Sequence, residues 1–81
     1  MKILDLEAGD DVIVKFIGKT VVEVFEYEDT DLHDPVEEIF EAGEEIEVNV
    51  VSVNEFSLDV QFGDGSIAFI SPKFIEFVDF V

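Results

Sequence analysis

This sequence of 81 residues contains no cysteine and no arginine, and only four lysines oppose its 21 acidic residues. The lack of cysteine excludes disulfides, thiolate chemistry and cysteine-based metal sites. No long apolar run occurs, so neither a signal peptide nor a membrane-spanning segment is expected. Residues 1–81 are enough for a single domain whose core folds alone with marginal stability.

The shortage of basic residues leaves a formal net charge of −17. Proteins that bind DNA or RNA directly need a basic surface, so direct binding to nucleic acid is not expected, and anionic membranes are disfavoured for the same reason. The charge favours a basic protein surface as partner, because a strong field raises the association rate. Since 48% of the residues are hydrophobic, including nine Phe, a disordered acidic tail is excluded.

The strongest local signal is the Asp-Gly dipeptide at positions 64–65, which separates two runs of alternating apolar and polar residues. Asp-Gly suits a two-residue type I′ turn, because both central residues of that turn need positive φ. The resulting register sets Phe62 opposite Ile67, so the apolar faces of the two strands coincide. A three-residue loop at 63–65 would set Phe62 opposite Ser66 and is therefore not preferred.

The run Glu45–Val53 alternates in the same way, and a three-residue loop at 54–56 pairs Val50 with Val60 and Val48 with Phe62. Together with the hairpin, which sets Val60 opposite Phe69, this run predicts a three-stranded antiparallel meander with one buried face. The side chains expected on that face are Ile46, Val48, Val50, Leu58, Val60, Phe62, Ile67 and Phe69.

A second hairpin is predicted nearer the N-terminus. Residues 12–17 alternate as a strand, and Gly-Lys at 18–19 fits a two-residue type II′ turn before a partner strand over 20–28. This pairing leaves Glu23 opposite Val14 on an apolar face. An exposed edge or a β-bulge explains the conflict better than a functional carboxylate does.

Residues 34–37, Asp-Pro-Val-Glu, have the features of a helix start: Asp as N-cap, Pro at the first position and a carboxylate at the third. The apolar residues that follow share one face, and Gly43 stands where a C-terminal glycine belongs. A short helix over 35–42 is therefore expected. So short a helix has no stability of its own, so packing of its apolar face must hold it.

The C-terminal part predicts a single helical turn at 71–73 and a last strand over 74–81 that is apolar on both faces. We expect that strand to be covered within a monomer, which is favoured over a homodimer. The elements together predict a mostly β fold: a small antiparallel barrel or rolled sheet of five to six strands with one short helix. This pattern resembles the SH3-like barrels in outline, without a family motif that would carry over functional residues.

Residues 6–14 and 40–48 resemble each other, since each places a glycine turn and acidic residues before a strand. Duplication is one explanation. Shared turn-then-strand chemistry is the preferred one, because the similarity fades afterwards.

Catalytic chemistry finds little support. His33 is the only histidine, it lies among carboxylates, and no serine motif accompanies it, so it is expected to be a solvated loop residue. Asp29, Asp31 and Asp34 could supply oxygen ligands to Ca²⁺, but their spacing does not match an EF-hand loop. No enzyme activity, cofactor or metal site is predicted.

The stretch from residue 23 to residue 47 holds twelve acidic residues and no lysine or arginine. Solubility alone does not explain it, because ordinary surfaces intersperse both signs of charge. The residues of this stretch expected to bind a partner are Glu28, Asp29, Asp31, Asp34, Glu37, Glu38, Glu41, Glu44, Glu45 and Glu47.

The leading functional hypothesis is nucleic-acid mimicry, in which carboxylates on a rigid scaffold occupy the phosphate sites of a basic nucleic-acid-binding protein. Phage-encoded inhibitors of restriction or CRISPR enzymes act in this way, and the chain would then work in the cytoplasm of a prokaryotic host. The alternative is an acidic protein–protein interaction or assembly module that does not compete with nucleic acid. Adaptation to high salt fits less well, because the chain has nine Phe, abundant Ile and no Arg.

Overall fold

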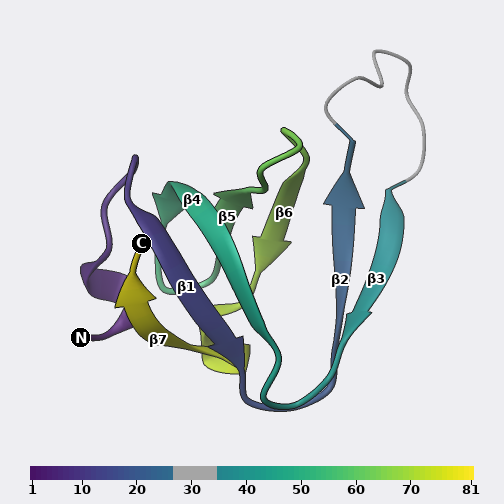
Figure 1. The fold of residues 1–81 in the computed structure, drawn as a ribbon, viewed down its shortest axis with the longest axis horizontal. Helices are drawn as coiled ribbons and strands as arrows, with labels where there is room; N and C mark the ends of the chain where they lie inside the picture. Colours follow the sequence, from purple (N-terminus) through teal and green to yellow (C-terminus); the bar gives the residue numbers. More distant parts are fainter. Residues whose placement is uncertain (27–34) are drawn as a thin grey trace.

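The computed structural model describes residues 1–26 and 35–81. They form one antiparallel sheet of seven strands in the order β3-β2-β6-β5-β4-β1-β7 (Figure 1). The sheet is strongly curved. It does not close into a barrel, because β3 and β7 lie at opposite ends of the strand order and do not pair with each other. The strands are β1 Asp11–Phe16, β2 Thr20–Phe25, β3 Val36–Phe40, β4 Glu45–Val53, β5 Leu58–Gln61, β6 Ile67–Ile70 and β7 Ile75–Phe80.

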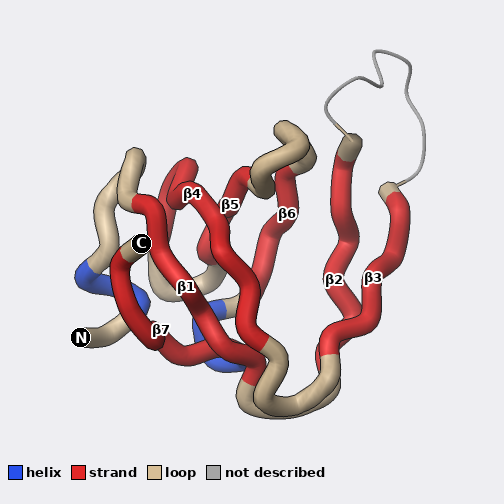
Figure 2. Tube along the Cα trace, in the orientation of Figure 1, coloured by secondary structure: helices blue, strands red, loops and turns tan. Residues whose placement is uncertain are grey.

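Two single turns of 3₁₀ helix, η1 Ile3–Asp5 and η2 Pro72–Phe74, are the helices of the described chain (Figure 2). The turn predicted at 71–73 is therefore confirmed, one residue later. No helix in residues 1–26 or 35–81 has the length and apolar character needed to cross a bilayer.

The prediction of a helix over 35–42 is wrong, because residues 36–40 form β3 and pair with β2. The ladder sets Val36 opposite Val24 and Ile39 opposite Val21, so branched side chains meet across the strands. A helix of eight residues is marginal in isolation, whereas in the hairpin one side of the β3 backbone pairs with β2 and Phe40 is buried. This strand raises the count above the five or six expected.

The predicted hairpin over 12–28 is also wrong, because β1 pairs with β4 and β7 while β2 pairs with β3 and β6. The inward side chains of β2 are Val22 and Val24, which are buried. Glu23 lies on the opposite, exposed face, directly across from Glu37. The conflict that suggested an edge or a bulge at Glu23 therefore does not arise.

The meander formed by β4, β5 and β6 is confirmed, and so is the pairing of Val50 with Val60. A bulge follows Val50, so that Ser52 pairs with Asp59 and the connecting loop covers 54–57 instead of 54–56. The bulge explains the extra loop residue, since it adds one residue to β4 without a partner on β5.

The register of the β5–β6 hairpin differs from the predicted one. The turn uses the three-residue loop at 63–65: Gly65 N–H donates to the Phe62 carbonyl at 2.9 Å, and Phe62 N–H donates to the Ser66 carbonyl at 2.8 Å. Gly65 has a φ of 92°, as expected of the left-handed residue that ends such a loop. A glycine at this position therefore fits the longer loop as well as the shorter one.

This one-residue shift exchanges the two faces of β6. Val60 pairs with Ala68 instead of Phe69, and Val60 and Ala68 are fully buried whereas Phe69 is 53% exposed. Ile70 is buried beside them. Ser66 and Ala68 are the small side chains on the buried face of this segment.

The sequence repeat at 6–14 and 40–48 corresponds to a repeated structure. Gly9 N–H donates to the Val50 carbonyl at 2.7 Å, and the equivalent Gly43 N–H donates to the Phe16 carbonyl at 2.8 Å. Each glycine turn thus forms a backbone hydrogen bond with the strand that follows the other turn. Gly9 and Gly43 have φ values of 96° and 87°, which explains why both turns use glycine.

The core lies inside the curve of the sheet. Val12, Val14 and Phe16 of β1 are fully buried, and the ring of Phe16 stacks on Phe40 of β3 with centroids 4.5 Å apart. This stack connects the β2–β3 hairpin to β1, which lies toward the other end of the strand order. The remaining buried apolar residues are Ile3, Leu6, Val22, Val24, Val48, Val50, Leu58, Val60, Ala68, Ile70 and Ile75.

Candidate functional site

The residues predicted to bind a partner do not form one cluster in the described chain. Glu28, Asp29, Asp31 and Asp34 lie outside the described residues, as does His33. Glu37 and Glu38 belong to β3, Glu41 and Glu44 flank the turn before β4, and Glu45 and Glu47 belong to β4.

Glu37 and Glu38 point to opposite faces of the sheet, because side chains alternate along a strand. Glu37 lies opposite Glu23, and Glu38 lies opposite Val22. Three strands, β2, β6 and β5, separate β3 from β4 in the sheet. The structure therefore separates the acidic groups of β3 from those of β4.

The first acidic surface covers the outer faces of β1, β4 and β7. Lys15 pairs across β1 with Glu45 of β4 and Glu76 of β7, and its Nζ lies 3.0 Å from the Glu76 Oε1. The hydrogen bond and the attraction to Glu76, with a smaller contribution from Glu45, raise the pKa of Lys15. Within residues 1–26 and 35–81 this is the one ion pair.

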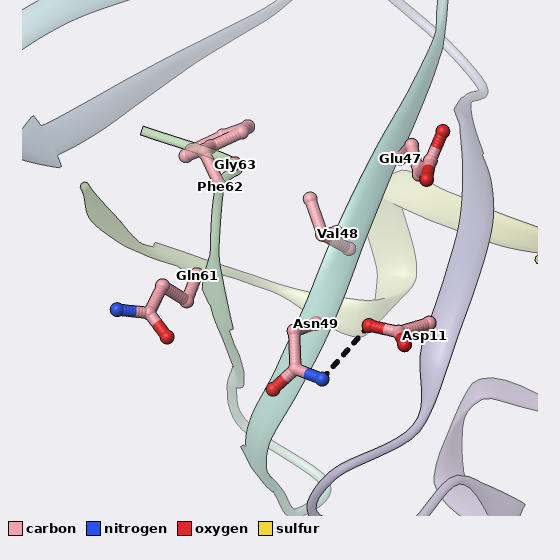
Figure 3. Close-up of a pocket in the computed structure, with 7 residues that line it drawn as sticks. All are labelled: Asp11, Glu47, Val48, Asn49, Gln61, Phe62 and Gly63. Carbon is pink, nitrogen blue, oxygen red and sulfur yellow. Dashed lines mark hydrogen bonds between the residues drawn. The ribbon is translucent and has the colours of Figure 1, made fainter. Parts of the chain in front are cut away.

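A shallow groove of about 380 Å³ lies between β1, β4 and the end of β5 (Figure 3). The Asn49 side-chain amide donates to the Asp11 Oδ1 at 2.9 Å and to the Gly9 carbonyl at 3.1 Å. Figure 3 shows Asp11 beside Asn49, Glu47 farther along β4, and the Gln61 amide across from Asn49. Its other lining residues are Val48, Phe62 and Gly63.

This groove offers carboxylate and amide groups for hydrogen bonding beside an apolar strip. No set of three or more His, Cys, Asp or Glu residues in the described chain is placed to hold a metal ion. The carboxylates of Asp11 and Glu47 in the groove can accept hydrogen bonds from a basic group.

A second acidic surface is a cleft of about 180 Å³ between the β2–β3 hairpin and the β5–β6 turn. Its apolar lining comes from Val24 of β2, Val36 of β3 and Phe62. The polar lining residues are Glu26, Glu38, Asp64 and Ser66.

The charge of Asp64 at this cleft is stabilised by the turn itself. The Asp64 Oδ1 accepts the Ser66 N–H at 2.9 Å. Hydrogen bonds from the Ser66 backbone and side chain lower the pKa of Asp64 below its ordinary value. Asp64 is therefore ionised at neutral pH.

Sequence reasoning missed an apolar surface on the outer face of β2, β3 and β6. Val21 lies directly opposite Ile39, and Phe25 meets Phe69 edge to face with ring centroids 5.6 Å apart. The alternation of Val21, Glu23 and Phe25 was visible, but alternation does not tell which face of a strand is buried. The predicted registers turned Val21, Phe25 and Phe69 inward.

No protein-family model, curated protein or solved structure matches this chain. Its charge, its exposed apolar side chains and the open edges of its sheet are therefore the observations from which a function can be inferred.

Proposed function

We propose that this chain is a non-catalytic inhibitor that binds a basic nucleic-acid-binding protein and blocks that protein's access to DNA or RNA. The observation that carries the proposal is the set of exposed carboxylates held on strands, where Lys15 is the one cation of the described chain that faces them and its ion pair is with Glu76. Glu45 and Glu47 lie on the same face of β4, at the strand repeat of about 6.8 Å for alternate residues. Glu23 and Glu37 lie side by side across β2 and β3.

A regular array of negative charge is what a phosphate-binding surface recognises, since DNA carries about one charge per 1.7 Å of axis and its partners present matching Lys and Arg. Because the strand pairing already orders the backbone that carries these carboxylates, binding a partner costs side-chain freedom alone. The net charge of −17 adds long-range steering toward a basic partner. A monomer without cofactor or metal suffices for this role.

The setting that fits best is the cytoplasm of a prokaryotic host, where a phage-encoded protein of this kind would inhibit a restriction or CRISPR enzyme. The contacts are assigned to the acidic stretch identified in the sequence, from Glu28 to Glu47. In the described chain they include the acidic outer surface of β4 and the β3 strand.

The second candidate is an acidic interaction or assembly module that does not compete with nucleic acid. The exposed apolar face of β2, β3 and β6 favours it, because a pure phosphate mimic needs no apolar contact.

A two-step experiment tests the proposal. The chain is immobilised to capture partners from host or phage-infected cells, and the purified partner is then assayed for DNA and RNA binding by gel shift while the chain is titrated in. We expect the chain to displace nucleic acid, with affinity falling steeply as salt rises. A partner that keeps its nucleic acid while bound to the chain would show that mimicry is wrong and that the module is right.

A matched pair of variants localises the effect. Glu45→Lys with Glu47→Lys should reduce displacement about tenfold or more, because both carboxylates lie on the exposed face of β4. Glu7→Lys with Glu55→Lys makes the same change in net charge at exposed positions outside that face and should have a much smaller effect. Equal losses in both variants would contradict a role for the β4 surface.

A further inference from the structure

The strand β3 has one unpaired side. It is the last strand of the sheet at that end, and within the described residues its backbone pairs with β2 alone. Figures 1 and 2 show the β2–β3 hairpin standing apart at one end of the curved sheet, with β3 outermost. An edge strand of this kind presents a row of free N–H and C=O groups that can pair with another extended chain.

Apolar surface borders this edge on both faces of the hairpin. On the outer face Val21, Phe25, Ile39 and Phe69 are between 39% and 58% exposed. On the inner face, Val36 continues into the cleft that Val24 and Phe62 line. An added strand could therefore place side chains against apolar surface on either side of the sheet.

The acidic residues beside β3 determine which kind of chain can pair with this edge strand. Glu37 and Glu38 follow one another on β3, and the nearest cross-strand acid, Glu23, reinforces Glu37. Glu38 lines the inner cleft together with Glu26 and Asp64. A second copy of this chain paired along β3 would bring carboxylates against carboxylates, which disfavours self-association.

We propose that β3 is a docking edge for a basic, extended segment of the partner protein, which adds to the sheet as an eighth strand. The segment opposite Val36, Glu37, Glu38 and Ile39 then has the pattern apolar-basic-basic-apolar. One basic side chain of the partner's segment lies beside Glu37 and Glu23 on the outer face. The next extends over Val36 toward Glu38 and Asp64 on the inner face.

This inference deepens the proposed function, because it names the part of the basic partner that docks and the way it is held. Backbone pairing supplies affinity that is independent of sequence, and the two acidic sites supply the preference for adjacent Lys or Arg. It also accounts for exposed apolar side chains and exposed carboxylates on the same hairpin.

The test uses the full chain and a synthetic probe, acetyl-Thr-Val-Lys-Arg-Val-Thr-amide. Binding is measured by calorimetry, and the site is located by backbone amide NMR shifts. We expect a one-to-one complex whose largest shifts fall on residues 36–40. Shifts spread evenly over the acidic faces of β1 and β4 would overturn the proposal.

Two N-methylated probes separate strand addition from plain charge attraction. Each carries methyl groups on alternate backbone amides, one set on even and the other on odd positions. An added strand uses amides of one parity toward β3, so one probe should lose binding while the other keeps it. Equal binding of both probes would overturn the proposal, and this readout does not depend on any variant of the chain folding.

Glu37→Lys with Glu38→Lys should weaken the unmethylated probe about tenfold or more, whereas Glu7→Lys with Glu55→Lys should weaken it less than about threefold. Equal weakening would contradict docking at β3.

If the probe binds at β3 but the captured partner keeps its DNA and RNA, the docking edge stands and the proposed inhibition fails. If nucleic acid is displaced while the probe does not bind, the inhibition stands and the docking edge fails.

Discussion

At the scale of single residues, Asp64 both shapes the β5–β6 turn and contributes charge to the cleft beside β3. Its carboxylate accepts the Ser66 N–H, and this contact fixes the start of β6. The turn therefore links the register of the sheet to the acidity of the cleft, because the same hydrogen bonds that order the loop lower the pKa of Asp64.

The Asp64→Asn substitution tests this link through pH. The hydrogen bonds from Ser66 hold the pKa of the folded Asp64 carboxyl below its ordinary value of 3.8. The contribution of this carboxyl to stability is therefore present above that value and is lost as pH falls through the lower folded pKa. We expect the wild type to be more stable than Asp64→Asn at about pH 6, with the difference shrinking as pH falls below the ordinary pKa of Asp. Urea unfolding at each pH measures this difference in the free energy of unfolding, and Glu55→Gln is the control. A difference that does not shrink would contradict the prediction.

Val60 tests the buried side of the same hairpin. Its side chain is fully buried, so Val60→Ala should lower the free energy of unfolding by about 1–3 kcal/mol through lost burial and a residual cavity. The same substitution at Val51, which is exposed beside the β4 bulge, should change it by less than about 0.5 kcal/mol. Equal losses measured by urea unfolding would show that the described face of the sheet is not the core.

At the scale of elements, the β2–β3 hairpin is the least anchored part of the sheet. Only Val24 and Phe25 of β2 pair with β6, and the Phe16–Phe40 stack provides the other main attachment. The hairpin nevertheless keeps two like charges, Glu23 and Glu37, in direct opposition. A cation from a partner would relieve that repulsion, as the proposed docking edge requires.

Replacing one of the two charges should stabilise the free hairpin. Glu37→Lys turns a repulsive cross-strand pair into an attractive one, so we expect the free energy of unfolding to rise by about 0.5–1 kcal/mol at low salt. The gain should shrink as salt screens the exposed pair. Glu55→Lys makes the same change in net charge without a cross-strand acid, and should gain less. A gain that is no larger at Glu37 would contradict the β2–β3 register.

At the scale of the whole molecule, repulsion among 21 acidic residues opposes the compact state, because four lysines cannot balance them. The core that resists this repulsion is small, since the chain has only 81 residues. Stability and partner binding therefore depend on salt in opposite directions, with screening favouring the fold and weakening the attraction to a basic partner.

The melting temperature should accordingly rise as sodium chloride is increased from low concentration to about 0.5 M, because screening relieves the repulsion. A variant that neutralises four exposed acids, with Gln at positions 7, 41, 44 and 55, should melt higher at low salt and respond less to added salt. Circular dichroism melts measure both. A wild-type melting temperature that stays flat over this range would contradict the prediction.

The sequence by itself determined most strands and the chemistry of the surface. Period-two alternation identified the strands around 12–17 and 45–53, because side chains alternate strictly across a pleated strand. The strand predicted over 74–81, which is apolar on both faces, corresponds to β7. Glycine marked the turns at Gly9 and Gly43, since both need positive φ. The excess of acidic side chains also follows from composition alone.

Only the tertiary structure decided which strands pair and which face of each is buried. The helix-start signals at 34–37 predicted a helix over 35–42, yet residues 36–40 form a strand because pairing with β2 outweighs the weak preference of so short a helix. The loop at 63–65 moves Phe69 to the outside by a shift of one residue. The candidate docking edge arises from the same long-range pairing, since a strand is an edge only through what its neighbours do. Local sequence does not specify such partners, so the apolar face and the free side of β3 were visible only in the folded chain.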